Sequence, residues 1–375
     1  MRHGRLLPPA VAGALAALAL LPPPGVAAAG GPPALYAVRD GRSVAVAGAD
    51  GARRTVLRLT RGTRGSAALA LSGDGTRLAA RHGADAVRVV DLPSGRVRTI
   101  RRTGRATELR FSPDGTRVAV VGARPGRFRD QLRTCAVASG RCRTVDGRRV
   151  LGAPAWAPDG RRLAWIAAVG EDAAPELMAG DGRRNRTIAR FRFRGTRVWF
   201  PDSPIWDRGG VAWASTRVRL QGGELAGILA SRIQRWDGRT VRTVVTRPAD
   251  DGIPLAAIAP VGGGPGLVAL ATREARTRSE LRLVTVAADG TVGETGVVLG
   301  RFGDDGADGV LGLHPLVDGR VAVVVRGDDG VPGHGPRPRL QLVTIGGVDG
   351  SSAGPEVAEG DELAVATPWP GGAPL

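Results

Sequence analysis

Lysine is absent from this chain of 375 residues, asparagine occurs once, and there are only four histidines. Without lysine, a Ser-x-x-Lys nucleophile cannot be built. The histidines beyond the N-terminal segment are His82, His314 and His334, and no pair of them has the spacing of metal ligands. The sequence therefore predicts no catalytic residue and no metal ligand among them, although His314 is the one histidine placed to face a central channel.

Acidic residues are outnumbered, because 53 basic residues, all of them arginine, face 35 aspartates and glutamates and give a formal net charge of +18. Such a balance favours an anionic partner, which could be a nucleic acid, an acidic wall polymer or an anionic membrane surface. Attraction of this kind is salt-dependent and only weakly specific. We expect no sequence-specific binding of nucleic acid.

Residues 1–29 have the pattern of an export signal. Arg2 and Arg5 form a positive start, an apolar run extends from Ala10 to Leu21, and small residues offer cleavage near Ala28 or Ala29. The apolar run is shorter than the roughly 20 residues of a spanning helix, and no later segment could cross a membrane. We expect residues 30–375 to be secreted or held in the cell envelope, with a net charge of about +16 after cleavage.

One short sequence motif recurs along residues 30–375 and marks the repeats of the chain. It reads Ser-Pro-Asp-Gly or a close variant, followed by an apolar strand with period 2, at residues 71–78, 111–118 and 156–163. Proline presets φ for a tight turn, and glycine accepts the left-handed conformation that ends it. The turn residues are Gly75, then Pro113, Asp114 and Gly115, then Pro158, Asp159 and Gly160. Strand repeats at this spacing predict an all-β fold, a single β-propeller over residues 30–375.

Two series of glycine turns count the repeats. One closes the innermost strand of each unit, at Gly75, Gly115, Gly160, Gly210, Gly264, Gly319 and Gly371. The other closes an outer hairpin, at Gly51, Gly95, Gly140, Gly182, Gly238, Gly290 and Gly350, mostly as Asp-Gly. Both series predict seven four-stranded blades, with six or eight as the alternatives. The first unit lacks an innermost strand, and residues 362–367 supply one, so we expect the C-terminal strand to close the ring.

Cys135 and Cys142 are the only cysteines, and they flank the Ser139-Gly140 turn. Facing residues of a hairpin lie close enough to be bridged, and an exported protein meets an oxidising compartment. A metal site would need two further ligands, and a redox couple is normally Cys-x-x-Cys. We predict a cross-strand disulfide that contributes about 2 to 3 kcal/mol.

The Ser-Pro-Asp-Gly repeats resemble those of TolB-like and WD-repeat-like propellers of bacterial envelope proteins. The close match covers residues 66–82, 106–122 and 152–168. The resemblance implies a periplasmic or extracellular protein-binding scaffold. It is specific for architecture, because its residues build a turn, and the chain has no room for the N-terminal α/β domain of TolB. The repeats also resemble those in the propellers of prolyl oligopeptidase-like enzymes, but we expect no hydrolase domain after the propeller.

Two clusters have both a functional and a structural interpretation. Carboxylates at Asp304, Asp305 and Asp308 could hold a structural calcium ion, although solvated loop acids fit better because the EF-hand spacing fails. Trp199 to Trp213, with Arg192, Arg194 and Arg197 nearby, could form an aromatic and basic surface for sugars or single-stranded nucleic acid. Packing between blades is the stronger interpretation, because Phe111, Trp156 and Trp206 share one repeat position and Val120, Trp165 and Trp213 share another.

These observations favour an exported, monomeric, non-catalytic propeller that binds a protein or an anionic polymer, without a cofactor. The alternative is a propeller hydrolase or lyase that acts on an anionic polymer or a small ester in the central channel. Inserted Gly-rich and Pro-rich loops follow the third unit. Because loops on a rigid scaffold often carry function, we expect the binding surface on units four to seven.

Deleting residues 360–375 tests the predicted closure. Because the deletion opens a sheet edge, we expect a far larger loss of stability than trimming an ordinary tail gives. Thermal unfolding of the full and shortened chains measures the difference. A soluble truncation of equal stability would contradict the closure.

Overall fold

The computed structural model describes residues 35–40, 42–48, 52–59, 68–123, 130–168, 174–222, 224–248, 255–260, 266–275, 278–302, 309–315, 321–327, 337–344, 352–359 and 362–365. All regular elements in these ranges are β-strands, and all their pairings are antiparallel. Within the same ranges there is no helix long and apolar enough to span a membrane. The proposed signal segment, residues 1–29, lies outside the described residues.

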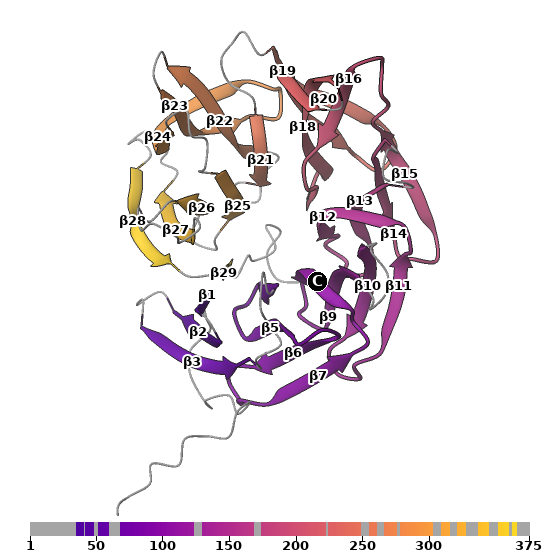
Figure 1. Ribbon diagram of the computed structural model, residues 1–375, viewed down its shortest axis with the longest axis vertical. Coiled ribbons are helices and arrows are strands. Elements are labelled where there is room, and N and C mark those ends of the chain that lie inside the picture. The colour runs from indigo at the N-terminus through magenta and orange to yellow at the C-terminus, as the bar shows by residue number, and fades with distance from the viewer. Residues whose placement is uncertain are drawn as a thin grey trace, which may run out of the picture.

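The described strands form seven sheets arranged around a common centre, with the last strand of each sheet on the outside (Figure 1). The first sheet contains β29 (Glu362–Val365), β1 (Tyr36–Asp40), β2 (Ser43–Ala47) and β3 (Arg53–Arg58). The second contains β4 (Leu69–Leu71), β5 (Arg77–His82), β6 (Ala86–Asp91) and β7 (Val97–Arg101), and the third β8 (Arg105–Phe111), β9 (Arg117–Ala123), β10 (Asp130–Ala136) and β11 (Cys142–Asp146).

The remaining four sheets follow in chain order. The fourth contains β12 (Arg149–Trp156), β13 (Leu163–Ala168), β14 (Glu176–Gly180) and β15 (Asn185–Arg190). The fifth contains β16 (Arg197–Pro201), β17 (Ile205–Asp207), β18 (Gly210–Gln221), β19 (Glu224–Trp236) and β20 (Val241–Pro248). The sixth contains β21 (Leu255–Pro260), β22 (Leu267–Ala275), β23 (Arg278–Val286) and β24 (Val292–Phe302), and the seventh β25 (Gly309–Pro315), β26 (Val321–Gly327), β27 (Arg337–Thr344) and β28 (Ser352–Glu359). Each sheet is a blade, and the predicted all-β propeller is confirmed.

The repeat turns fold as their residues predict. In the third blade the Gly115 N–H donates to the carbonyl of Ser112 at 2.8 Å, and Gly115 has a φ of 65°. The Ser112 hydroxyl donates to Asp114 at 2.6 Å, and that carboxylate accepts the N–H of Thr116 at 3.0 Å. Gly75 and Gly160 end the equivalent turns with φ values of 67° and 60°. The serine and aspartate therefore fix the turn before the next strand begins.

The C-terminal strand completes the first blade. Strand β29 pairs antiparallel with β1, with Val365 opposite Tyr36 and Glu362 opposite Arg39. Val365 is buried in an apolar cluster with Tyr36 and with Ala322 of the seventh blade. The two ends of the described chain thus meet in one sheet. Residues 366 and 367 of the expected strand lie outside the described residues.

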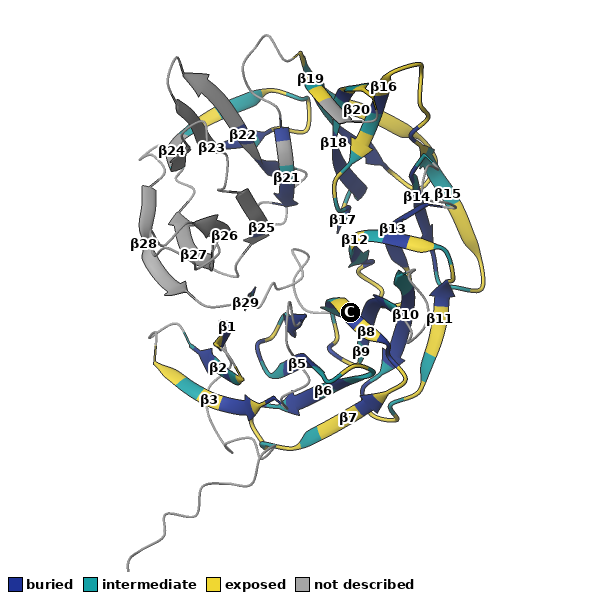
Figure 2. Ribbon diagram, in the orientation of Figure 1, coloured by how far each residue is buried: buried dark blue, intermediate teal, exposed yellow. Residues whose placement is uncertain are grey.

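Apolar packing joins the described blades in sequence from the first to the sixth, and the seventh to the first. Figure 2 shows the buried residues on the strands of the first five blades. Five tryptophans belong to these contacts, and each is at most 8% exposed: Trp156, Trp165, Trp206, Trp213 and Trp236. Trp156 and Trp165 pack against the third blade, and Trp206 and Trp213 against the fourth. The predicted packing of aromatic rings between blades is confirmed for Trp156, Trp165, Trp206 and Trp213.

Arginines on the outer strands reach from one blade to the next. Arg98 of β7 donates to the carbonyl of Ala138 at 2.5 Å, Arg143 of β11 donates to the carbonyl of Asp181, and Arg186 of β15 donates to the carbonyl of Gly238 at 3.5 Å. Each acceptor belongs to the outer hairpin turn of the following blade. The three contacts repeat with the period of the blades and link the second blade to the fifth.

The fifth blade departs from the predicted four strands, because its inner position is occupied by two short strands, β16 and β17, that both pair with β18. Pro204 stands between them and has no N–H to continue the ladder. Strands β18 and β19 are also extended, with 12 and 13 residues. The prediction of four strands in every blade was therefore wrong here.

The two cysteines form the predicted disulfide. Cys135 and Cys142 are opposite each other on β10 and β11 and are joined, with their Cα atoms 4.0 Å apart. Cys135 is fully buried among the apolar residues that join the second and third blades. The bridge therefore fixes the outer hairpin of the third blade beside its core.

Replacing both cysteines with alanine tests this contribution. We expect the free energy of unfolding to fall by about 2 to 3 kcal/mol, because the unfolded chain regains the freedom of the closed loop. Urea unfolding measures the change. A reducing agent should lower the stability of the natural chain to the same extent and leave the variant unchanged. Equal midpoints for the natural chain and the variant without reducing agent would contradict the expectation.

Candidate functional site

Of the residues considered for catalysis or metal binding, the structure describes His82 and His314, which lie on different blades. His82 ends β5 in the second blade, and His314 lies on β25 in the seventh. Burial, followed by the charge of Arg88, lowers the pKa of His82. His334 and the predicted calcium cluster, Asp304, Asp305 and Asp308, lie outside the described residues. Across the described ranges, no group of three or more His, Cys, Asp and Glu side chains could hold a metal ion.

One serine sequence has the Gly-x-Ser-x-Gly spacing of hydrolases, from Gly350 to Gly354. In those enzymes the serine occupies a sharp turn between a strand and a helix. Here Ser352 is the first residue of β28, the outermost strand of the seventh blade, and pairs with Thr344. The local structure is therefore not the one that activates a serine.

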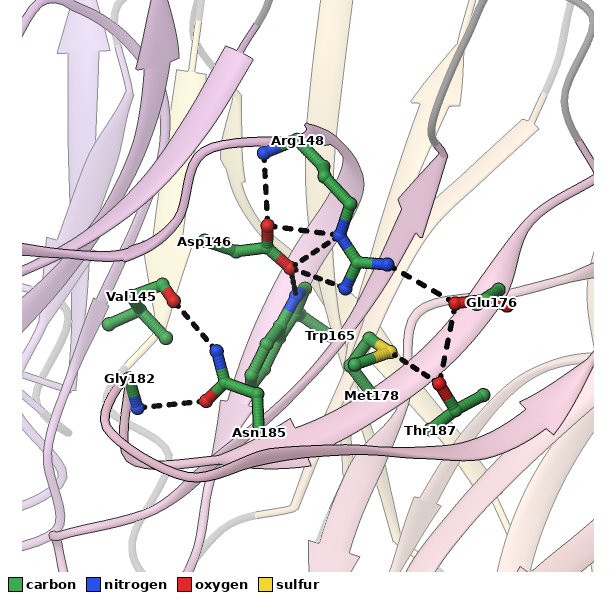
Figure 3. Close-up of polar contacts among 9 residues, drawn as sticks. All are labelled: Val145, Asp146, Arg148, Trp165, Glu176, Met178, Gly182, Asn185 and Thr187. Atoms are coloured by element: carbon green, nitrogen blue, oxygen red, sulfur yellow. Dashed lines mark hydrogen bonds and ion pairs between the residues drawn. The ribbon is translucent and has the colours of Figure 1, made fainter.

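A charged network joins the third and fourth blades (Figure 3). Asp146, at the end of β11, accepts a hydrogen bond from the indole N–H of Trp165 at 2.8 Å. It also forms an ion pair with Arg148 at 2.8 Å. Arg148 also pairs with Glu176 at 3.2 Å. Glu176 is in turn paired with Arg190 at 2.8 Å. Two carboxylates and two guanidinium groups thus form one chain of contacts.

These carboxylates remain ionised. Burial alone would raise the pKa of Asp146, but the hydrogen bonds from Arg148 and Trp165 outweigh it and lower the pKa. Burial would also raise the pKa of Glu176, but the hydrogen bonds and charges of Arg190 and Arg148 outweigh it and lower the pKa. A general acid must hold a proton near neutral pH. This network therefore fits a structural link between blades rather than an acid and base pair.

A second buried carboxylate, that of Asp207, is also paired with an arginine within the fold. Asp207, at the end of β17, pairs with Arg235 of β19 at 2.6 Å, and the two side chains are 1% and 3% exposed. Asp207 also accepts the N–H of Gly209 at 2.7 Å. The ion pair therefore anchors the turn that joins β17 to β18.

Four arginines without a described carboxylate partner and one tryptophan share a face of the fifth blade. We call this set the basic face: Arg197, Trp199, Arg217, Arg219 and Arg232. On β16 and β18, Arg197 is opposite Arg219 and Trp199 is opposite Arg217. Arg232 of β19 is opposite Ser215, two residues before Arg217 on β18. Because side chains alternate along a strand, these five lie on the same side of the sheet.

The centre of the basic face is a stacked guanidinium. The Arg232 Cζ atom lies 3.9 Å from the ring centroid of Trp199, and its Nε–H donates to the Ser215 hydroxyl at 3.2 Å. Burial, followed by the positive charge of Arg217, lowers the pKa of Arg232. No described carboxylate forms an ion pair with the four arginines of the basic face. Their charge is therefore available to a ligand.

The sequence predicted an aromatic and basic surface in this region, but it did not predict which residues form it. Of the predicted Trp199 to Trp213 surface, Trp206 and Trp213 are buried between blades, and only Trp199 is partly exposed. Arg217, Arg219 and Arg232 were not singled out, because only the pairing of β16, β18 and β19 brings them beside Trp199. Phe193 and Phe200 in the same region are each 44% exposed.

Further arginines line the outside of the ring. In the second to fifth blades, an arginine follows the hairpin glycine, at Gly95, Gly140, Gly182 and Gly238, and a second arginine comes two or three residues later. The exposed members are Arg96, Arg98, Arg141, Arg143, Arg183, Arg184, Arg186, Arg239 and Arg242. We call them the rim arginines. They extend positive charge over the second to fifth blades.

Known structures share the architecture but little sequence. A prolyl endopeptidase structure has a TM-score of 0.56 and 14% identity over 91% of this chain and 50% of that chain. Oligogalacturonate lyase from Vibrio parahaemolyticus has a TM-score of 0.51 and 11% identity over 87% and 86% of the two chains. This chain has the β-propeller fold. TolB from Acinetobacter baumannii has a TM-score of 0.47 and 13% identity over 89% and 83% of the two chains. No protein-family model and no curated protein sequence matches the chain.

The Asp146 network predicts a pH dependence of stability. Because the folded pKa of Asp146 is lowered, its stabilising effect is present above the unfolded value of about 4 and is lost as the pH falls through the folded value. We expect Asp146→Asn to lower the free energy of unfolding at pH 7 by about 1 to 3 kcal/mol.

Denaturant unfolding between pH 7 and pH 3 measures this dependence. The difference between the natural chain and Asp146→Asn should shrink as the pH falls below about 4. The control is Asp40→Asn at an exposed position, for which we expect no change at either pH. A difference for Asp146→Asn that stays constant across the range would contradict an ionised Asp146.

Proposed function

We propose that this chain is an exported, non-catalytic β-propeller that binds an anionic polymer, or a protein with an acidic surface, in the cell envelope or outside the cell. The observation that carries the proposal is the division of charge in the described structure. The buried carboxylates Asp146 and Asp207 and the partly exposed Glu176 are each paired with arginine within the fold. The basic face and the rim arginines leave positive charge on the outside.

Charge of this kind suits an extended anionic partner. Rigid sheets hold the rim arginines at the regular spacing of the blades, so a long ligand can meet several of them together. Each contact releases counterions, so the affinity should depend strongly on salt. A compact neutral partner would leave this charge unused.

Export is supported by two independent features. Residues 1–29 have the sequence pattern of a cleaved signal. The Cys135–Cys142 disulfide suits an oxidising compartment, because cytosolic proteins rarely keep such bridges. We propose that the mature chain begins after Ala28 or Ala29 and acts as a monomer.

A propeller hydrolase or lyase acting on an anionic polymer is the second candidate. Its support is the likeness in fold to oligogalacturonate lyase and a prolyl endopeptidase. An enzyme of this kind needs acids or histidines that converge from several blades. The described carboxylates of the Asp146 network point instead to structural use, and so we favour the scaffold.

A capture experiment tests the proposal. Mature protein, residues 30–375, is immobilised and exposed to envelope and culture fluid of the native organism, and bound material is eluted in salt steps for mass spectrometry and polymer analysis. We expect one defined acidic protein or polymer to stay bound at a salt concentration that removes bulk polyanion. Elution of only mixed polyanion at moderate salt would contradict a dedicated partner.

The same eluted polymer distinguishes the two candidates. After incubation with the mature protein, its chain length is measured by size-exclusion chromatography, with heat-denatured protein as the control. The scaffold predicts an unchanged length. Shortening of the polymer by the folded protein would overturn the non-catalytic role and support the enzyme.

A further inference from the structure

The two central arginines of the basic face are held close together although they repel each other. The charge of Arg217 is felt at Arg232, and no described carboxylate pairs with either of them. Like charges held together cost stability, and a buried or half-buried charge costs more than an exposed one. The repulsion between the two guanidinium groups would be relieved by an anion that binds between them.

Arg232 is also fixed in a geometry suited to an anion. Its guanidinium carbon lies over the Trp199 ring, 3.9 Å from the centroid, and its Nε–H donates to the Ser215 hydroxyl. Arginine has five N–H groups, so the terminal ones remain for a ligand. A guanidinium fork held in this way donates two parallel hydrogen bonds to one carboxylate, phosphate or sulfate group. Little side-chain freedom is left to lose on binding.

The face continues beyond this pair in one direction. Arg197 and Arg219 are opposite each other on β16 and β18, two residues along the strands from Trp199 and Arg217. Residues two apart on a strand are about 7 Å apart. Four guanidinium groups in two successive rows fit a ligand that carries more than one anionic group along its length.

We propose that Arg217 and Arg232, with Trp199 behind them, bind an oxyanion group of a linear anionic polymer, and that Arg197 and Arg219 bind the next such group. The site rests on the proposed function for the length of its ligand, but not for its chemistry. The oxyanion is a carboxylate, phosphate or sulfate. This site would fix the position of the polymer on the propeller, because successive anionic groups bind at defined arginines. The rim arginines, in contrast, attract the polymer without fixing its position.

The first test uses inorganic sulfate and inorganic phosphate as probes, with sodium chloride at equal ionic strength as the reference. Tryptophan fluorescence and thermal unfolding follow binding to the natural chain, Arg217→Gln, Arg232→Gln and the control Arg161→Gln. Arg161 is exposed on the fourth blade and outside the basic face. We expect each basic-face variant to bind the oxyanions about tenfold more weakly, and the control to bind as the natural chain does.

Stability without ligand separates a binding role from a structural one. Removing one of two repelling charges should leave the melting temperature of Arg217→Gln unchanged or raise it. A lowered melting temperature together with unchanged oxyanion binding would assign a structural role to these arginines and overturn the site. Equal weakening by Arg161→Gln would also overturn it, because general charge would then explain the binding.

Arg232→Lys tests the fork itself. Lysine keeps the positive charge but cannot donate two parallel bonds from a plane. We expect oxyanion binding to fall several-fold while the net charge is constant, and Arg161→Lys to have no effect. Full retention of binding by Arg232→Lys would overturn the stacked geometry as the basis of recognition.

Polygalacturonate and dextran sulfate are the polymer probes, one with carboxylates and one with sulfates, and neutral dextran is the control. For the preferred polymer, each basic-face variant should reduce the salt slope of the binding constant by about one. Polymer binding that is equal in all variants would overturn this site and leave the proposed function standing. Absence of binding of either polymer to the natural chain, with sulfate still bound, would instead refute the polymer as the partner.

Discussion

Each blade of this propeller can cover its apolar faces only with the neighbouring blades, and the rest of the structure depends on that mutual cover. The described clusters always draw residues from two consecutive sheets. None of the described clusters belongs to a single sheet, so an isolated sheet would expose the apolar residues that its neighbours cover. The pairing of β29 with β1 extends this dependence across the two ends of the described chain.

Much of this architecture was readable from the sequence, because tight turns impose strict demands on residue type. Gly115 needs a positive φ, and the Ser112 and Asp114 side chains close the turn locally, so the repeat predicts hairpins without any long-range information. The paired cysteines were predictable for the same reason, since a short hairpin fixes which residues face each other. Turns and short hairpins can therefore be predicted from a few neighbouring residues.

The basic face and the split inner strand of the fifth blade could not be predicted in this way. Arg217 and Arg232 are distant from Trp199 in sequence, and only strand pairing makes them neighbours. Trp206 and Trp213 shared repeat positions with known core residues, whereas Trp199 had no counterpart in the repeat. Where the chain departs from its period, the repeat no longer indicates which residues meet, and the candidate site lies at such a departure.

The outer arginine contacts give the ring a direction. Each donor, Arg98, Arg143 or Arg186, belongs to the earlier blade, and each acceptor belongs to the later one. From the second blade to the fourth, the outer strand of each blade therefore donates a hydrogen bond to the outer hairpin of the next. Loss of one guanidinium would therefore remove a contact from the hairpin of the following blade and none from the hairpin of its own blade. The basic face belongs to the fifth blade, where these three contacts end.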